Sequence, residues 1–263
     1  MRRLITLTTD FGTRDSFVGV MKGVILSINP SVQIVDITHE ISPQNIREAS
    51  FTLLTSHSFF PPGTIHTVVV DPGVGSKRRC IAVETRDYYF VLPDNGIITP
   101  LLKKVIRVVE LNREEYFRRP VSFTFHGRDI FAPVSAYLSL GKELEELGDP
   151  IPVESIQRIP WNEPEYRGEE VEGEILHIDR FGNLITSLEW EKVKKWAGGR
   201  RFVAFFKGEE IIRLVTAYQD EREAPFLIPG SSGYLEVSLY GRRAKDYFSC
   251  GVGEKIILRI LPQ

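Results

Sequence analysis

Short runs of β-branched residues alternate with helix-patterned segments through the first half of the chain, and this alternation restricts the fold more than any other feature. The runs are rich in Val, Ile and Thr and are bounded by Gly, Pro, Asp or Asn, which predicts strands over residues 4–9, 32–37, 64–70, 80–85, 88–92 and 105–111. Apolar stripes at helical spacing predict helices over residues 16–28, 45–59 and about 128–140. Strands separated by helices predict an α/β domain whose mostly parallel sheet is covered on both faces.

The alternation of strand and helix patterns ends after residue 150. Four prolines without any strand or helix period lie in residues 148–168, and we expect residues 151–168 to form a linker. Beyond it, short strands separated by Gly-containing turns are predicted over residues 171–178, 184–188, 201–206, 211–216, 234–239 and 255–261, with one short helix near residues 189–196. The sequence therefore predicts an α/β catalytic domain over residues 1–150 and a small, closed or nearly closed β-barrel over residues 169–263.

Charge and cysteine content exclude several classes of protein. The chain carries 33 Lys and Arg against 35 Asp and Glu, so a nucleic acid that binds through counterion release has little to contact. Cys80 and Cys250 are too far apart in sequence for a CxxC site or a disulfide framework. The first apolar stretch ends at Asp10, and no run approaches the roughly 18 apolar residues of a membrane span. We expect a cytoplasmic protein with no nucleic-acid or membrane partner.

Polar residues gather directly after the predicted strands, where α/β sheets bind ligands. The segments are Asp10-Phe11-Gly12 with Asp15, Asp36-Ile37-Thr38-His39, residues 71–75, residues 93–96 and residues 125–129. Taken singly, each could be a cap or a turn. Asp71 is more informative, because it follows a buried-type run and precedes glycines that let the backbone approach a ligand. Arg78 follows nearby and could neutralise a buried carboxylate.

Two further signals have alternative explanations. His126 precedes the third predicted helix, where it could be a core histidine or a proton carrier. In the second half, Phe181 could stack on an adenine and Asn183 could pair with its edge, although a turn between barrel strands explains residues 178–183 almost as well. The Ser231 region gives a weaker signal and could be a hairpin loop.

Several enzyme classes lack their motifs here. The chain has no GxGxxG, GxxxxGK[ST], GxSxG or HExxH pattern, and its Asp10-Phe11-Gly12 triplet lacks the other kinase motifs. Rossmann dehydrogenases, P-loop NTPases, zincins and kinases are therefore excluded. A metal-dependent hydrolase stays open, since possible ligands are present as Asp10, Asp36, His39, Asp71, Asp94, His126 and Asp129.

Six segments together resemble the S-adenosylmethionine hydrolases, also called SAM hydroxide adenosyltransferases, which are relatives of fluorinase and chlorinase. They are residues 10–12, 36–39, 70–75, 93–96, 124–131 and 179–183, in the order and approximate spacing of that family. The resemblance implies an N-terminal α/β domain, a C-terminal β-barrel, and a homotrimer that holds its substrate between the N-terminal domain of one subunit and the barrel of the next. The implied reaction is attack of water or hydroxide on the ribose 5′ carbon of S-adenosyl-L-methionine, giving adenosine and L-methionine without metal or redox cofactor.

The resemblance also implies roles for individual residues. Asp71, Arg78 and His126 would surround the attacking water. Chemically, Arg78 could favour its hydroxide character, His126 could accept or orient its proton, and Asp71 could fix the geometry. The sequence does not divide these tasks among the three residues. Arg79 is adjacent, and spacing alone favours Arg78. The substrate-binding residues implied are Asp10 at the ribose hydroxyls, Asp179 at the methionine ammonium, Phe181, Asn183 and Ser231 around adenine, and also Asp15 and Gly127.

Alternatives within and outside the family stay open: a halide-using adenosyltransferase, a metal-dependent hydrolase, or a non-catalytic adenosine or S-adenosylmethionine binder. Asp71 argues against a halide, because both halogenating relatives have an uncharged Tyr there and a poorly hydrated carboxylate would repel an anion. Gly127 does not discriminate, since fluorinase has a Ser there but chlorinase resembles this chain. Gln44 stands where fluorinase has a Trp against the ribose. A binder could lose Asp71, Arg78 and His126, yet all three are present.

Overall fold

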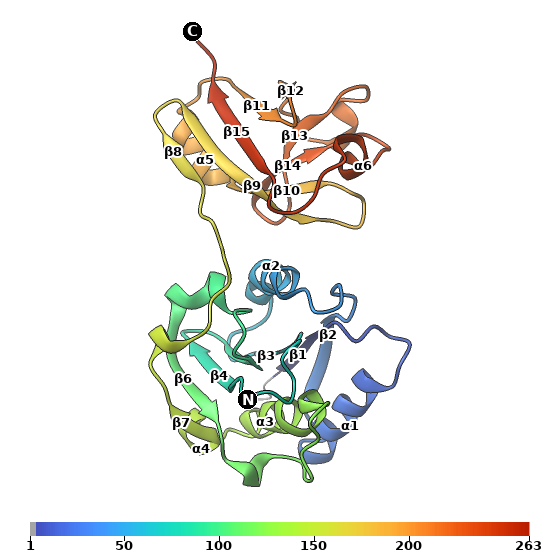
Figure 1. Ribbon diagram of the computed structural model, residues 1–263, viewed down its shortest axis with the longest axis vertical. Coiled ribbons are helices and arrows are strands. Elements are labelled where there is room, and N and C mark those ends of the chain that lie inside the picture. The colour runs from blue at the N-terminus through green and yellow to red at the C-terminus, as the bar shows by residue number, and fades with distance from the viewer. Residues whose placement is uncertain (1–3, 263) are drawn as a thin grey trace. The chain divides into compact units, whose positions relative to one another are not determined.

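The computed structural model describes residues 4–262 and forms two compact units, Met1–Pro160 and Trp161–Gln263 (Figure 1). The segment expected to be a linker is divided between them. Residues 151–160 belong to the first unit, whereas β8 (Glu165–Arg167) pairs with β9 (Glu170–Ile178) in the second. Gly168, with φ +59°, supplies the tight turn that joins β8 to β9.

A seven-stranded mixed sheet forms the centre of the first unit, in the order β2-β1-β3-β5-β4-β6-β7. Its strands are β1 (Leu4–Thr9), β2 (Gln33–Thr38), β3 (Ile65–Val69), β4 (Cys80–Thr85), β5 (Tyr89–Pro93), β6 (Val105–Leu111) and β7 (Gly148–Pro150). The pairings from β2 to β5 are parallel, with Ile5 opposite both Ile34 and Ile65. The remaining pairings are antiparallel. For β4 and β5 the reason is the short connection, because residues 86–88 are too few for the crossover that parallel strands need.

Helices cover both faces of this sheet (Figure 1), which confirms the α/β class. On one face α1 (Phe17–Ile28) and α3 (Ala132–Ser139) pack through Met21, Ile25 and Val134 onto Ile5 and Leu7. The opposite face is covered by α2 (Ile46–Ser56), which contributes Ala49 and Leu53 to a second cluster. The remaining short elements are α4 (Leu144–Leu147), the 3-10 helices His57–Phe59, Thr99–Lys104, Glu114–Tyr116 and Val153–Ser155, and the π-helical turn Gly127–Phe131.

The second unit is an all-antiparallel, nearly closed barrel-like sheet in the order β12-β11-β15-β9-β10-β14-β13. Besides β8 and β9, its elements are β10 (Leu184–Glu189), β11 (Phe202–Phe206), β12 (Glu209–Ile211), β13 (Phe226–Pro229), β14 (Tyr234–Ser238), β15 (Lys255–Ile260), α5 (Trp190–Ala197), α6 (Ala244–Phe248) and the 3-10 turn Tyr218–Asp220. Its core includes Val171, Leu184, Leu235 and Ile256.

One strand prediction in this unit is wrong. The strand expected over residues 211–216 already ends at Ile211, and beyond it only Leu214 makes an isolated bridge, to Leu227. Ile212 and Leu214 are 53% and 43% exposed, so these apolar side chains do not form the buried face of a strand. The neighbouring β13, which sequence analysis missed, supplies the buried strand instead.

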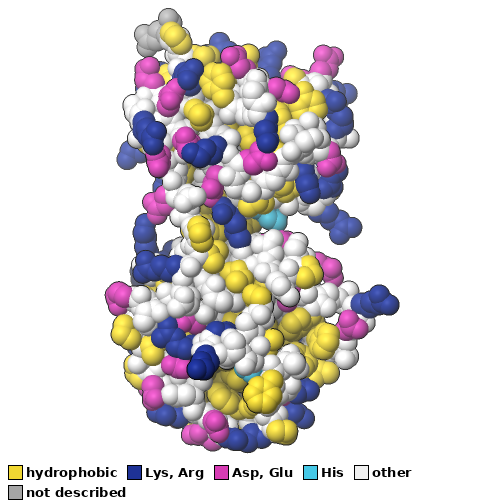
Figure 2. All heavy atoms as spheres, in the orientation of Figure 1, with side chains coloured by type: hydrophobic (Ala, Val, Ile, Leu, Met, Phe, Trp, Pro, Cys, Tyr) yellow, Lys and Arg dark blue, Asp and Glu magenta, His cyan; other side chains and the backbone are white. Residues whose placement is uncertain are grey.

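Basic and acidic side chains are interspersed over the face drawn in Figure 2. Cys80 and Cys250 are buried free thiols, one in each unit. Across residues 4–262, every helix is too short or too polar to cross a bilayer.

Candidate active site

A cleft of about 300 Å³ opens in the first unit at the carboxyl ends of β1 and β3. Asp10 directly follows β1, and Asp71 follows β3 after one further residue. Gln44 lies just before α2, and His126 lies at the start of the π-helical turn. Neighbouring parallel strands end at the same edge of the sheet, which is why residues distant in sequence meet here.

The guanidinium of Arg78 joins Asp71 to His126. Its Nε donates to Asp71 Oδ1 at 2.8 Å, and its Nη2 donates to Asp71 Oδ2 and, at 2.8 Å, to His126 Nδ1. Its Nη1 donates to Cys80 Sγ at 2.8 Å and to the Arg79 carbonyl oxygen at 3.3 Å. A guanidinium has five N–H donors, and each of them therefore has an acceptor within the protein. The side chains of Arg78 and Asp71 are only 9% and 5% exposed, so water screens this ion pair little.

A glycine-containing turn brings Asp71 and Arg78 together. Val74 N donates to the Asp71 carbonyl oxygen at 3.2 Å, and Ser76 N donates to that of Gly73 at 3.1 Å. Gly75 has φ +76°, and a Cβ there would lie 2.3 Å from the carbonyl oxygen of Phe123. Only glycine therefore lets the loop before His126 close against this turn.

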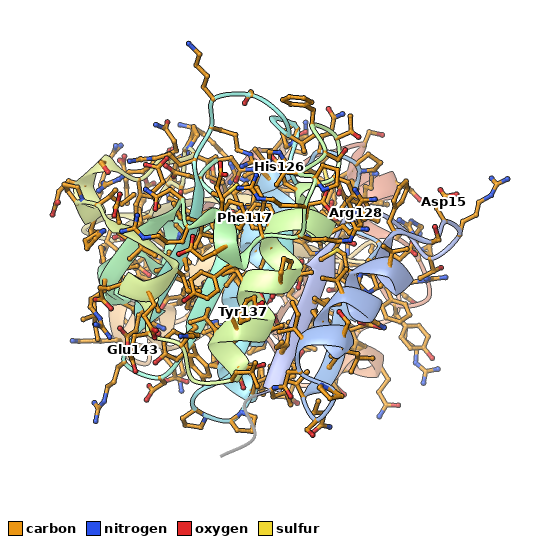
Figure 3. The ribbon with its side chains drawn as sticks, turned by 90° about the horizontal axis from the view of Figure 1, so that it is seen from below. Asp15, Phe117, His126, Arg128, Tyr137 and Glu143 are labelled. Atoms are coloured by element: carbon orange, nitrogen blue, oxygen red, sulfur yellow. The ribbon has the colours of Figure 1, made fainter. Side chains whose placement is uncertain are left out.

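His126 has a fixed protonation pattern. Because a guanidinium can only donate, Nδ1 must accept from Arg78, and the proton of the neutral ring resides on Nε2. Burial and the positive charge of Arg78 lower the pKa of His126 below its ordinary 6.5, although Asp71 and Asp129 act in the opposite direction. At neutral pH the ring is thus a hydrogen-bond donor at Nε2. Figure 3 shows His126 at the end of the helical segment that continues through Tyr137.

Asp129 fixes the loop that precedes His126. Its fully buried carboxylate accepts from Ser122 N at 2.9 Å and from Arg128 Nε at 2.6 Å. Burial raises the pKa of Asp129, but these hydrogen bonds and the nearby positive charges outweigh burial and lower it overall. Phe125, which lines the cleft, packs edge-on against Phe17 with ring centroids 5.2 Å apart. Sequence analysis considered Asp129 only as a metal ligand and missed this supporting role.

Asp10 is oriented by the backbone on the other side of the cleft. Its Oδ2 accepts from Gln44 N at 2.8 Å. Gln44 has φ +63°, a left-handed conformation that residues with a side chain rarely adopt. The chain therefore accepts local strain at the point where this N–H meets Asp10.

Two predicted ligand-binding segments form hydrogen bonds with the backbone beside residues that line the cleft. In residues 36–39, the carbonyl oxygen of His39 accepts from Gly12 N at 2.7 Å, which holds the turn after Asp10. In residues 93–96, Asn95 Nδ2 donates to the Val70 carbonyl oxygen at 2.9 Å, next to Asp71. Both segments thus fix the residues that line the cleft.

The predicted substrate-binding residues of the first unit lie in different places. Asp10 and Gly127 line the cleft with Asp71 and His126. A Cβ on Gly127 would lie 3.2 Å from both Met21 Sδ and Phe125 Cε2, so the close packing there favours glycine. Asp15 is exposed in the loop between β1 and α1, away from His126 in Figure 3.

The other predicted substrate-binding residues belong to the second unit. Asp179 and Asn183 close the turn between β9 and β10: Asn183 N and Nδ2 donate to the Asp179 carboxylate at 2.8 and 2.9 Å. Phe181 is 75% exposed within this turn, and Ser231 is exposed between β13 and β14. Sequence analysis missed Glu236 on β14, a buried carboxyl that accepts from Tyr218 Oη at 3.1 Å. Burial raises the pKa of Glu236.

Most of the suggested metal ligands have other partners. Asp36 pairs with Lys22, Asp94 with Arg79 and Asp129 with Arg128. Between residues 4 and 262, no three His, Cys, Asp or Glu side chains converge as a metal ion requires.

Comparisons with known proteins agree over nearly the whole chain. Two family models match: the SAM hydroxide adenosyltransferase N-terminal domain over residues 5–148, and the C-terminal domain over residues 173–257. The (R)-S-adenosyl-L-methionine hydrolase of Methanocaldococcus jannaschii is 38% identical over 90% of this chain and 88% of that protein. The protein of the same name from Thermus thermophilus is 35% identical over 98% of this chain and 100% of its own.

A more distant relative and a solved structure extend this comparison. The fluorinase of an Actinoplanes species is 27% identical over 73% of this chain and 74% of that protein. The crystal structure of an uncharacterized conserved protein from Thermotoga maritima has a TM-score of 0.91 and 37% identity, and the match covers 97% of this chain and 99% of that one.

The left-handed backbone of Gln44 gives a test of the Asp10 side of the cleft. We expect Gln44→Gly to be more stable than Gln44→Ala by about 0.5–1 kcal/mol. Glycine has no Cβ and adopts positive φ freely, whereas alanine is strained there. This strain exceeds the additional backbone entropy that glycine loses on folding. Both variants keep the N–H that donates to Asp10. Urea unfolding of the two proteins measures the difference. Equal stability would contradict the left-handed conformation.

Proposed function

The chain belongs to the SAM hydroxide adenosyltransferase family, and we propose from this that it hydrolyses S-adenosyl-L-methionine to adenosine and L-methionine. The relatives named as hydrolases match it over most of its length, whereas the fluorinase match is weaker and covers 73% of the chain. The observation that carries the proposal is the shielded network of Asp71, Arg78 and His126 at the cleft, which is suited to orienting a water molecule.

The leaving group makes few demands on the protein. As water attacks the ribose 5′ carbon, the C–S bond breaks with its electron pair on sulfur, and the sulfonium departs as the neutral thioether of methionine. The new C–O bond gives adenosine, and one water proton is released. The reaction requires a nucleophile in line at roughly 3–3.5 Å and a site shielded from bulk water. We therefore propose that it needs no metal or redox cofactor.

We assign three different roles around the attacking water. His126 donates its Nε2–H to one lone pair of the water and so directs the other lone pair at the carbon. Asp71 accepts a water proton as the C–O bond forms, since a carboxylate oxygen bonded to Arg78 still has a lone pair. Arg78 has used all its donors, so it acts as a positioning residue for the other two. This proposed role differs from the expectation that Arg78 favours hydroxide character on the water directly.

Solvent oxygen should appear in the product. In ¹⁸O-labelled water, adenosine should carry the label at its 5′ hydroxyl, EDTA should leave the rate unchanged, and concentrated fluoride or chloride should give no 5′-halonucleoside. The reason is that the Asp71 carboxylate disfavours an anionic nucleophile where water screens it little. Mass spectrometry of the separated products makes these measurements, with Asp71→Ala as the inactive control. A halogenated or unlabelled product would contradict the proposal. Loss of activity in EDTA would favour a metallohydrolase. Substrate binding without turnover would indicate a non-catalytic binder.

The rate should fall in acid with a midpoint below pH 6.5. Burial and Arg78 lower the pKa of His126 from 6.5, so the ring gains its proton at a lower pH than an ordinary histidine does. Protonation then removes the Nδ1 acceptor and places a second cation beside Arg78. Measuring kcat against pH tests this, with His126→Gln as a neutral donor that cannot titrate. An unchanged acid limb in that variant would assign the limb to another group.

We also propose a homotrimer in the cytoplasm, with the substrate held by residues of two subunits. The resemblance to the family supports the trimer, and so does the division of the predicted substrate-binding residues, with Asp10 in the first unit and Asp179 and Asn183 in the second. Free Cys80 and Cys250 suit a reducing compartment.

Complementation tests the shared site. Asp71→Ala and Asn183→Ala should each be inactive alone, whereas co-expressed chains should recover activity, because about a quarter of randomly assembled sites join two intact halves across a ring interface. Light scattering should give the mass of three chains. A fully active monomer, or co-expressed chains that stay inactive, would contradict the arrangement.

A further inference from the structure

Cys80 touches the proposed catalytic network but takes no part in the chemistry described above. It is the first residue of β4, and only 7% of it is exposed. Its sulfur lies 2.8 Å from Arg78 Nη1 and 4.0 Å from His126 Nδ1. The thiol is therefore in direct contact with the residue that connects Asp71 to His126.

The acceptors around Arg78 leave its guanidinium one orientation. Asp71 takes the Nε–H and one Nη2–H, while Cys80 and the Arg79 carbonyl oxygen take the two Nη1–H groups on the other side. The ring of Phe131, 5.5 Å from Arg78 Cζ, restricts movement out of the guanidinium plane. In that orientation the second Nη2–H meets His126 Nδ1. If the sulfur were removed, one buried Nη1–H of Arg78 would lack an acceptor. A small rotation of the guanidinium toward another acceptor would then move Nη2 away from His126.

We propose that Cys80 is a positioning residue for the reaction: its sulfur, as an uncharged acceptor, holds Arg78 so that His126 keeps its proton on Nε2 and presents it to the nucleophilic water. The inference rests on the proposed hydrolysis. A thiol suits this position because sulfur accepts weakly and does not compete with Asp71 for the guanidinium. Burial raises the pKa of the Cys80 thiol, which keeps it uncharged although Arg78 opposes this.

Three substitutions separate hydrogen bonding from packing. Cys80→Val removes the acceptor and adds the bulk of one methyl group, whereas Cys80→Ser keeps an acceptor on a slightly smaller side chain. We expect kcat to fall roughly tenfold in Cys80→Val with KM changed less than about twofold, and to stay within about threefold of wild type in Cys80→Ser. Cys80→Ala removes the acceptor without adding bulk and replaces the valine variant if that protein unfolds. Cys250→Val is the matched control, because that thiol is equally buried but lies in the second unit.

A second readout does not depend on turnover. In protein labelled with ¹⁵N-histidine, nuclear magnetic resonance should show wild-type His126 with Nδ1 unprotonated and Nε2 protonated. In Cys80→Val, His126 should become a mixture of both neutral forms, and its titration midpoint should rise toward 6.5. The charged groups that face the ring, Arg78, Asp71 and Asp129, are unchanged in this variant, so the shift would report the orientation of Arg78.

The outcomes separate this inference from the proposed function. If wild-type protein does not hydrolyse S-adenosylmethionine, the proposed function fails, while the histidine spectra still test the role of Cys80. Wild-type spectra and kcat in Cys80→Val would overturn that role. So would a Cys80→Ser protein as impaired as Cys80→Val, because the sulfur would then contribute packing and not a hydrogen bond.

Discussion

The buried ion pair between Arg78 and Asp71 is the interaction on which the rest of the site depends. Moving two charges out of water is costly, and their attraction compensates only where the remaining donors and acceptors are also satisfied. Here two carboxylate oxygens, a histidine nitrogen, a thiol and a main-chain carbonyl surround one guanidinium. Removal of any one partner leaves a buried donor unsatisfied. The network is therefore rigid, and this rigidity would hold the proposed catalytic groups in place before a substrate binds.

The sheet topology makes this pair possible. In the sheet, β5 lies between β3 and β4, so the turn from β3 to β4 crosses over the carboxyl end of β5. Arg78 and Arg79 lie within that crossing, and consecutive side chains of extended backbone point to opposite sides. Arg78 faces Asp71, whereas Arg79 pairs with Asp94 at 2.6 Å beyond the end of β5. Sequence spacing alone favoured Arg78 over Arg79 as the site residue. The contacts of the two side chains give the physical reason for this choice.

The sequence predicted the strands and the residues that follow them, because strand runs and turn residues leave local signals. These signals are enough to place Asp10, Asp71 and His126 near one edge of the sheet. Contacts set by packing leave no such signal. Cys80 looks like an ordinary strand residue until its sulfur is seen against Arg78, and Glu236 looks like a solvent-facing residue of an alternating strand although it is buried. The β4–β5 hairpin was likewise missed, because two adjacent strand runs do not reveal their direction.

The charges at the cleft explain why a sulfonium substrate and a neutral nucleophile suit each other here. Among the described residues that line it, Asp10 and Asp71 carry negative charge and none is Lys or Arg. Arg78 lies behind Asp71 with its donors turned inward, so its positive charge offsets that carboxylate without offering an N–H to an anion. Asp10 would attract a cationic substrate, whereas a halide would meet two carboxylates and no exposed donor of Arg78. Water carries no charge and could both donate to Asp71 and accept from His126, so under the proposed function it is the nucleophile that would satisfy both groups at once.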